Sequence, residues 1–148
     1  LQAFRPVSGR GVRLRTGEGG LLIDDTYNAN PDSVRAAIDL LASLDGERLL
    51  VLGDMGEVGE RGPEFHREVG SYARERGLDA LFALGPMSAE AVTAFGEGSR
   101  HFDGLDALLE ALRTRLGPTV SVLVKGSRFM RMERVVQAIA ATQSEGVH

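Results

Sequence analysis

Three short polar stretches of the sequence carry side chains that can hold an anion or orient a reacting group. Residues 24–31 read DDTYNANP and supply two carboxylates, a phenol and two amides. Residues 52–55 read LGDM, in which a glycine and a carboxylate follow an apolar run. Residues 124–128 read VKGSR and group an amine, a hydroxyl and a guanidinium, a set that suits a carboxylate or a phosphate. These stretches are therefore the first candidates for a binding or catalytic site.

Two residue types that are otherwise rare in the chain occur within these stretches. Lys125 is the only lysine among 17 basic residues, and Asn28 and Asn30 are the only asparagines. If base composition or heat tolerance disfavours both types, the ones that remain are retained for a chemical need; chance is the alternative explanation. The rarity favours a functional role for Lys125.

Each stretch also has an ordinary structural interpretation. The first would be a helix cap beside a solvated acidic turn, since Asn30 suits the N-cap and Pro31 the first helical position. Gly53 would mark the loop after a strand, and residues 125–128 would form a surface turn. His66 lies within a predicted helix, where a histidine is more often structural or solvated than catalytic.

The periodicity of apolar residues predicts alternating strands and helices. Strand patterns occur at residues 11–16, 21–25, 48–52, 80–84, 100–102 and 120–124. Helical spacing occurs at residues 31–44, 63–76, 88–95, 105–116 and 130–141. In the second helix, Phe65, Val69 and Tyr72 or Ala73 are predicted to face inward.

This alternation predicts an α/β fold, a Rossmann-like three-layer sandwich whose mostly parallel sheet begins with an N-terminal edge hairpin. Ligands bind such sheets beyond the carboxyl ends of the strands, where all three polar stretches fall. We expect a lead-in segment at residues 1–10, one domain at residues 11–142 and a frayed tail at residues 143–148.

Composition narrows the classes of protein to which the chain could belong. The 148 residues are enough for one domain, and the absence of cysteine excludes disulfides and thiolate metal sites. A net charge of −4 argues against a nucleic-acid partner, and the apolar runs are too short for membrane insertion. Residues 1–15 do not form a signal peptide. We expect a cytoplasmic protein and a monomer. Because the chain begins with leucine, we also expect a fragment or a processed product.

Several nucleotide and hydrolase motifs do not occur in the sequence. There is no GxxxxGK[ST] phosphate loop, no GxGxxG that opens a helix, no serine elbow and no HExxH. A free-standing oxidoreductase on the same sheet would need the GxGxxG pattern. A non-catalytic nucleotide-binding or interaction module of the same fold remains the alternative to an enzyme domain, and an interaction module would bind partners through the open sheet edge.

Four blocks of sequence resemble the C-terminal domain of the Mur ligase family. They lie at residues 24–37, 51–57, 66–70 and 124–133, in the family's order, and residues 4–10 resemble the segment that leads into this domain. The tyrosine-asparagine form of the first block and the KGSR form of the last resemble the members that join D-Ala-D-Ala to UDP-N-acetylmuramoyl-tripeptide.

The resemblance implies an enzyme of three domains. ATP would phosphorylate the terminal carboxylate of the tripeptide, and the amine of D-Ala-D-Ala would attack the acyl phosphate in peptidoglycan synthesis. ATP and Mg²⁺ would be held mainly by a central domain that this chain lacks. The partners would be the enzyme's own N-terminal and central domains, and the chain alone should be inactive.

The resemblance also implies roles for individual residues. Arg10 and Asp25 would contact the phosphate and ribose of the nucleotide, and Tyr27, Asn28 and Asn30 would line the same face. Lys125 would be catalytic. A substrate-binding set would face the dipeptide and the reacting carboxyl. Its members are Gly53, Asp54, Met55, Gly126, Ser127 and Arg128. No residue of the chain is assigned to a metal.

Overall fold

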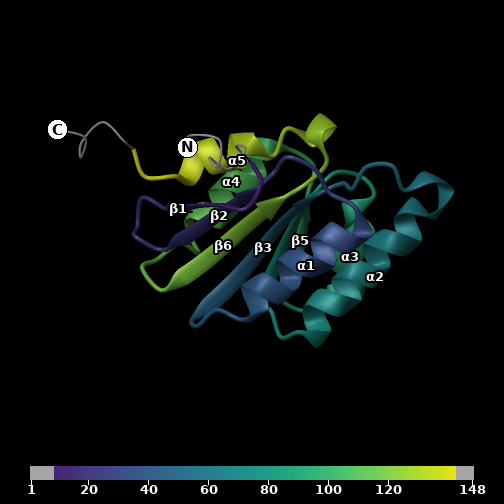
Figure 1. Cartoon of the computed structure of the whole chain (residues 1–148), viewed down its shortest axis with the longest axis horizontal. Coiled ribbons are helices and arrows are strands. Elements are labelled where there is room, and N and C mark those ends of the chain that lie inside the picture. Colours follow the sequence, from purple (N-terminus) through teal and green to yellow (C-terminus); the bar gives the residue numbers. More distant parts are fainter. Residues whose placement is uncertain (1–8, 143–148) are drawn as a thin grey trace, which may run out of the picture.

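The computed structural model describes residues 9–142, which form one six-stranded sheet between two layers of helices (Figure 1). The strand order is β1-β2-β6-β3-β4-β5. Only the β1–β2 pair is antiparallel, and the other four pairs are parallel. The strands are β1 (Val12–Arg15), β2 (Leu21–Asp25), β3 (Glu47–Gly53), β4 (Ala80–Leu84), β5 (Ser99–Phe102) and β6 (Val120–Lys125).

The helices divide between the two faces of the sheet. The helices of one face are α1 (Pro31–Ala42), α2 (Gly62–Glu75) and α3 (Ser88–Phe95). Those of the other face are α4 (Leu105–Arg113) and α5 (Glu133–Ile139). Two short 3₁₀ turns, η2 (Gly59–Arg61) and η3 (Arg128–Met130), lie in the connections. The predicted three-layer fold with its N-terminal edge hairpin is confirmed.

Strand β6 is buried on both faces, as its near-continuous apolar sequence requires in a covered parallel sheet. Val122 and Val124 pack into the core beneath α4 and α5, and Leu123 packs into the core beneath α1, α2 and α3. The strand therefore anchors Lys125, its last residue, at the centre of the carboxyl edge.

The order of the strands opens a crevice at this edge. β6 lies between β2 and β3, although it is the last strand in the sequence. The chain leaves β2 toward α1 on one face and leaves β6 toward α5 on the opposite face. Because neighbouring connections diverge there, the ends of β2 and β6 form the kind of switch point at which open α/β sheets bind ligands.

Helix α1 begins where the sequence predicts. Asn30 Oδ1 accepts the Ser33 N–H at 2.8 Å, and Ser33 Oγ accepts the Asn30 N–H at 3.0 Å. Pro31 occupies the first turn, where its missing N–H has no partner to lose. A cap of this kind contributes about 1 kcal/mol and fixes the direction in which the preceding loop enters the helix.

The largest differences from the predicted helix bounds, three residues each, are at the end of α4 and the start of α5. α4 stops at Arg113 instead of residue 116, because Thr114 and Arg115 donate to carbonyls three residues back and tighten the last turn. The last helix begins at Glu133 instead of residue 130, because Arg131 adopts a left-handed φ of 54°. The predicted tail and most of the predicted lead-in lie outside the described residues, so the domain boundaries stay predictions.

Helix α2 buries Val69 and Ala73, as predicted, and it also buries His66 and Gly70. Phe65 and Tyr72 are only partly buried. The inward face includes Gly70 because α3 approaches closely there: a Cβ atom on Gly70 would lie 2.2 Å from the carbonyl oxygen of Ala91. Within residues 9–142, no helix has the length and apolar character needed to cross a membrane.

Candidate functional site

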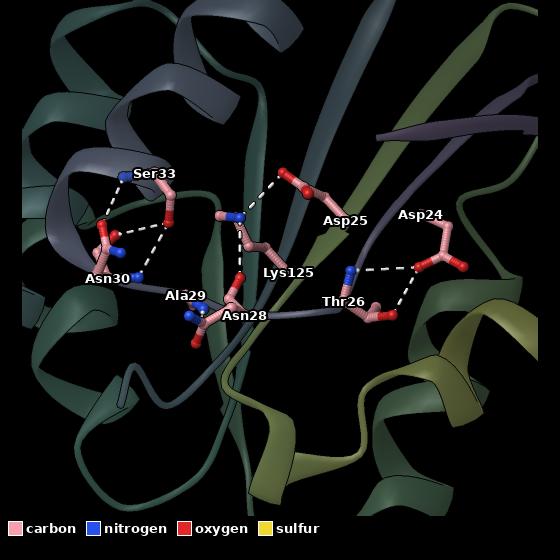
Figure 2. A network of polar contacts seen from close by, with 8 residues as sticks. All are labelled: Asp24, Asp25, Thr26, Asn28, Ala29, Asn30, Ser33 and Lys125. Carbon is pink, nitrogen blue, oxygen red and sulfur yellow. Dashed lines mark hydrogen bonds and ion pairs between the residues drawn. The ribbon is translucent and has the colours of Figure 1, made fainter. Parts of the chain in front are cut away.

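Lys125 lies at the end of β6 and joins two of the three polar stretches. Its Nζ donates to Asp25 Oδ2 and to the carbonyl oxygen of Asn28, both at 3.0 Å (Figure 2). The Lys125 side chain is 3% exposed and the Asp25 side chain 24% exposed. In the sheet register Asp25 lies directly beside Lys125, so the backbone itself places the ion pair. The pair fixes the loop after β2 against the sheet.

The two adjacent carboxylates of the first stretch serve different purposes. Side chains alternate along a strand, so Asp24 points away from Lys125 while Asp25 points toward it. Asp24 Oδ1 accepts the Thr26 hydroxyl at 2.6 Å and the Thr26 N–H at 3.2 Å, which closes a local turn. Asp24 is therefore a buried turn residue, and Asp25 is the partly exposed carboxylate that pairs with Lys125.

The second stretch presents mainly backbone atoms to the other loops. The Asp54 carboxylate is turned into the N-terminus of α3, where it accepts the Met87 N–H at 3.1 Å and the Ser88 N–H at 2.8 Å. The side chain of Met55 is completely buried in the core. The structure thus does not direct these two predicted substrate-binding side chains toward the crevice.

The three stretches nevertheless meet through their backbones, as predicted from the strand ends. Ser127 N–H donates to the Asp54 carbonyl, and Gly56 N–H donates to the Ala29 carbonyl, both at 3.0 Å. Together with the bonds from Lys125, these contacts link all three connections directly. We call residues 25–30, 53–56 and 125–128 the rim.

Gly53 and Gly126 allow this close contact between the ends of β3 and β6. A Cβ atom on Gly126 would lie 3.2 Å from Gly53 Cα and 2.5 Å from Met132 Cγ. A Cβ atom on Gly53 would lie 2.7 Å from the sulfur of the fully buried Met132. Both glycines are needed for space, since neither has a positive φ.

Positive charge and an aromatic ring mark the exposed side of the rim. The guanidinium carbons of Arg10 and Arg128 lie 3.8 and 4.8 Å from the ring centroid of Tyr27. An open depression of about 430 Å³ is lined by Thr26, Tyr27, Arg128, Arg131 and Glu133. Arg131 and Glu133 were given no role from the sequence, and only their position in the last block of the resemblance signalled them.

Asn28 and Asn30 differ in how they are used. Asn28 is exposed, and its Oδ1 accepts the Ala29 N–H at 2.8 Å. The side chain of Asn30 caps α1, which is the helix-cap role that its ordinary structural interpretation gives it.

Among the described residues, the buried side-chain oxygens without a hydrogen-bond partner belong to Ser88 and Ser127.

The two tyrosines of the chain are expected to ionise in separate steps. A hydrogen bond and the positive charge of Arg10, together with the charge of Arg128, lower the pKa of Tyr27 below its ordinary value. The hydrogen bond from Tyr72 to Asp39 raises the pKa of Tyr72. Phenolate absorbance should therefore rise in two steps with increasing pH, Tyr27 first. Tyr27→Phe should remove the early step and Tyr72→Phe the late one; a single shared step would contradict the predicted order.

Comparisons with known proteins agree with the fold and the sequence blocks. Residues 9–128 match the family model described as Mur ligase, glutamate ligase domain. The chain therefore belongs to this family, and the predicted resemblance to the Mur ligase C-terminal domain is confirmed.

Within the family, the chain is similar to ligases of one named specificity. It is 39% identical over 141 residues to the UDP-N-acetylmuramoyl-tripeptide–D-alanyl-D-alanine ligase of Escherichia coli, with 94% of this chain and 31% of that protein covered. It is 40% identical over 145 residues to the same ligase of Haemophilus influenzae, with the same coverage. The chain thus spans about a third of the length of these relatives.

A solved structure of a related ligase has a similar fold over the region that corresponds to this chain. The MurF ligase from Thermotoga maritima in complex with ADP superposes with a TM-score of 0.80 at 32% identity. The superposition covers 93% of this chain and 31% of that protein.

Proposed function

We propose that this chain forms the C-terminal domain of an ATP-dependent ligase that adds D-Ala-D-Ala to UDP-N-acetylmuramoyl-tripeptide in peptidoglycan synthesis. The observation that carries the proposal is the hydrogen-bonded rim at the carboxyl edge of the sheet. Its sequence blocks lie almost entirely within the range that matches the family model, residues 9–128. The names of the relatives support the choice of substrate.

The exposed side of the rim is the proposed nucleotide face. Arg10 supplies charge for a phosphate, and Asp25 supplies an acceptor for ribose hydroxyls, as the resemblance implies. Tyr27, Asn28 and Asn30 complete this face; the ring of Tyr27 lies beneath the Arg10 guanidinium. The ADP in the Thermotoga maritima relative supports a nucleotide here. The resemblance assigns Mg²⁺ mainly to the central domain; within residues 9–142 no group of three or more metal-binding side chains occurs.

The buried side of the rim is the proposed face for the dipeptide and the reacting carboxyl. Lys125 is its catalytic candidate, and its ammonium is fixed on two oxygens next to the crevice. The buried hydroxyl of Ser127 has no partner in the described part of the chain, which supports a contact with substrate. Gly53, Asp54, Met55 and Gly126 would contribute through their backbones.

Closure of this domain over a central domain is the proposed mechanical step. An acyl phosphate reacts with water, so closure protects it and brings the amine of the dipeptide into line. Phe129, 64% exposed, stands beside Arg128 at the rim and would be covered on closure. The proposed reaction would take place in the cytoplasm, where its UDP-linked substrate is made.

Calorimetry and a turnover assay test the proposal. The isolated chain should release no phosphate from ATP and should bind ATP weakly, because no phosphate loop occurs in its sequence. The proposed full-length ligase that contains this domain is called the longer protein below. It should release phosphate only when tripeptide and dipeptide are both present. Tight, magnesium-dependent binding of ATP by the isolated chain would instead favour a free-standing nucleotide-binding module.

Asn28→Ala in the longer protein is expected to lower ligase turnover at least tenfold, about 1.4 kcal/mol of transition-state stabilisation. The backbone carbonyl that accepts from Lys125 remains, so the change removes the exposed amide and its hydrogen bond with the Ala29 N–H. Initial rates at saturating substrate measure the effect. Gln137→Ala, which removes an exposed amide from α5, is the matched control. An unchanged rate for Asn28→Ala would remove this residue from the proposed nucleotide face.

A further inference from the structure

One buried histidine holds the base of the glycine-rich connection between β3 and α2. His66 is completely buried in the second turn of α2. Its Nε2 lies 3.0 Å from the Met55 nitrogen, and its Nδ1 lies 2.7 Å from the Gly62 carbonyl oxygen. Both partners belong to the backbone, one at each end of the segment 56–61. A single imidazole ring therefore ties the start of this connection to its end.

The two backbone partners define the chemical form of the ring. A backbone N–H can only donate, so Nε2 must be the unprotonated acceptor. A carbonyl can only accept, so Nδ1 must carry the hydrogen. His66 is thus a neutral imidazole with its hydrogen on Nδ1, and the opposite tautomer would break both contacts at once.

The segment that His66 holds is the one that bridges the rest of the rim. Asp54 offers its carbonyl to Ser127 N–H, and Gly56 offers its N–H to the Ala29 carbonyl. Met55, held by His66, lies between them. The Asp54 carboxylate adds a second anchor at the N-terminus of α3. Three consecutive residues therefore connect both other loops to two helices.

We propose that His66 is a positioning residue. Its Nε2 fixes the Met55 N–H and thereby sets where residues 54–56 present Asp54 to Ser127 and Gly56 to Ala29. The kinetic consequence rests on the proposed ligase function, since it concerns the orientation of Ser127 and the loop that carries Asn28. The side chain reaches the reacting groups only through the backbone of residues 54–56.

Two substitutions separate the two contacts of the ring. The amide of His66→Gln lies at the distance of Nε2 and can accept from Met55, but it loses the donor to Gly62. The amide of His66→Asn lies at the distance of Nδ1 and can donate to Gly62, but it leaves the Met55 N–H without a partner. Each variant loses one hydrogen bond, so a purely structural role predicts similar effects for both.

Amide hydrogen exchange on the chain tests the positioning directly. The amides of Met55, Gly56 and Ser127 should exchange about tenfold faster in His66→Asn, whereas Gly56 and Ser127 should keep nearly wild-type rates in His66→Gln. Equal acceleration in both variants would overturn the proposal. If either variant fails to fold, imidazole nitrogen shifts of the wild-type chain decide it, because hydrogen on Nε2 contradicts the assigned contacts.

Kinetics of the longer protein give the second readout. His66→Asn should lower kcat about tenfold with little change in the KM for ATP, and His66→Gln should recover most of kcat. Equal losses of kcat in the two variants would contradict positioning through Met55. If the wild-type protein has no ligase turnover, the proposed function fails, while the exchange rates still decide the role of His66.

Discussion

Lys125→Ala is expected to lower the turnover of the longer protein at least tenfold, about 1.4 kcal/mol of transition-state stabilisation. It is also expected to lower the free energy of unfolding of the chain by about 3 kcal/mol, the lower end of the range for breaking a buried ion pair. The lower end applies because Asp25 keeps some access to water. Initial rates and urea denaturation measure the two effects.

Two further variants separate the effect of the ion pair on turnover from its effect on stability. The double substitution Lys125→Met with Asp25→Asn leaves no unpaired charge, so it should regain much of the stability but none of the turnover. Arg67→Ala removes one partner of the exposed pair with Glu90 and should cost less than about 1 kcal/mol. Full turnover in a stable Lys125→Ala protein would exclude Lys125 from the proposed chemistry.

Gly70→Ala adds one methyl group to α2 and is expected to lower the stability of the fold markedly. The new Cβ would lie 2.2 Å from the Ala91 carbonyl oxygen and 2.8 Å from Ala91 Cα, so one helix backbone must move. Overpacking of this kind costs about 3 kcal/mol, and alanine returns about 1 kcal/mol through its higher helix propensity. The free energy of unfolding should therefore fall by about 2 kcal/mol, measured by denaturation.

The matched control for this substitution is Gly17→Ala. A Cβ atom on Gly17 meets nothing within 4 Å, and its φ is not positive. The stability of the Gly17→Ala variant should stay close to that of the wild type.

Gly70 lies one turn after His66 on α2, and Ala91 lies one turn after Ser88 on α3. Moving the helices apart should therefore also disturb residues 54–56, with faster amide exchange at Ser127. Unchanged stability of Gly70→Ala would mean that the helices are less closely packed than described.

The elements of the fold were predictable because their signals are local. Apolar alternation and apolar runs indicate the strands, and Asn30 with Pro31 indicates the start of α1. The late start of the last helix was not predictable, because it depends on a left-handed arginine in a sequence with no glycine at that position. The meeting of the three polar stretches followed from the predicted strand ends, because the carboxyl ends of parallel strands lie at one edge of the sheet.

The direction of individual side chains at the rim was not predictable from the sequence. Nothing in two adjacent aspartates indicates which one faces a lysine 100 residues later. The resemblance assigns Asp54 to the substrate, but its carboxylate accepts the N–H groups of Met87 and Ser88 at the start of α3, more than 30 residues along the chain. His66 was predicted to be structural or solvated, and only the tertiary contact of α2 with the β3 loop reveals its two partners.

The position of β6 between β2 and β3 has a consequence for how the protein is made. During synthesis the first five strands emerge from the ribosome before the strand that belongs in their middle. Until then β2 and β3 each leave an edge open, and edges of this kind pair readily with other chains. Sheet closure and the pairing of Asp25 with Lys125 must come together, late and across a long separation in sequence. A nascent chain that stalls before residue 120 would keep both edges open and would have no rim.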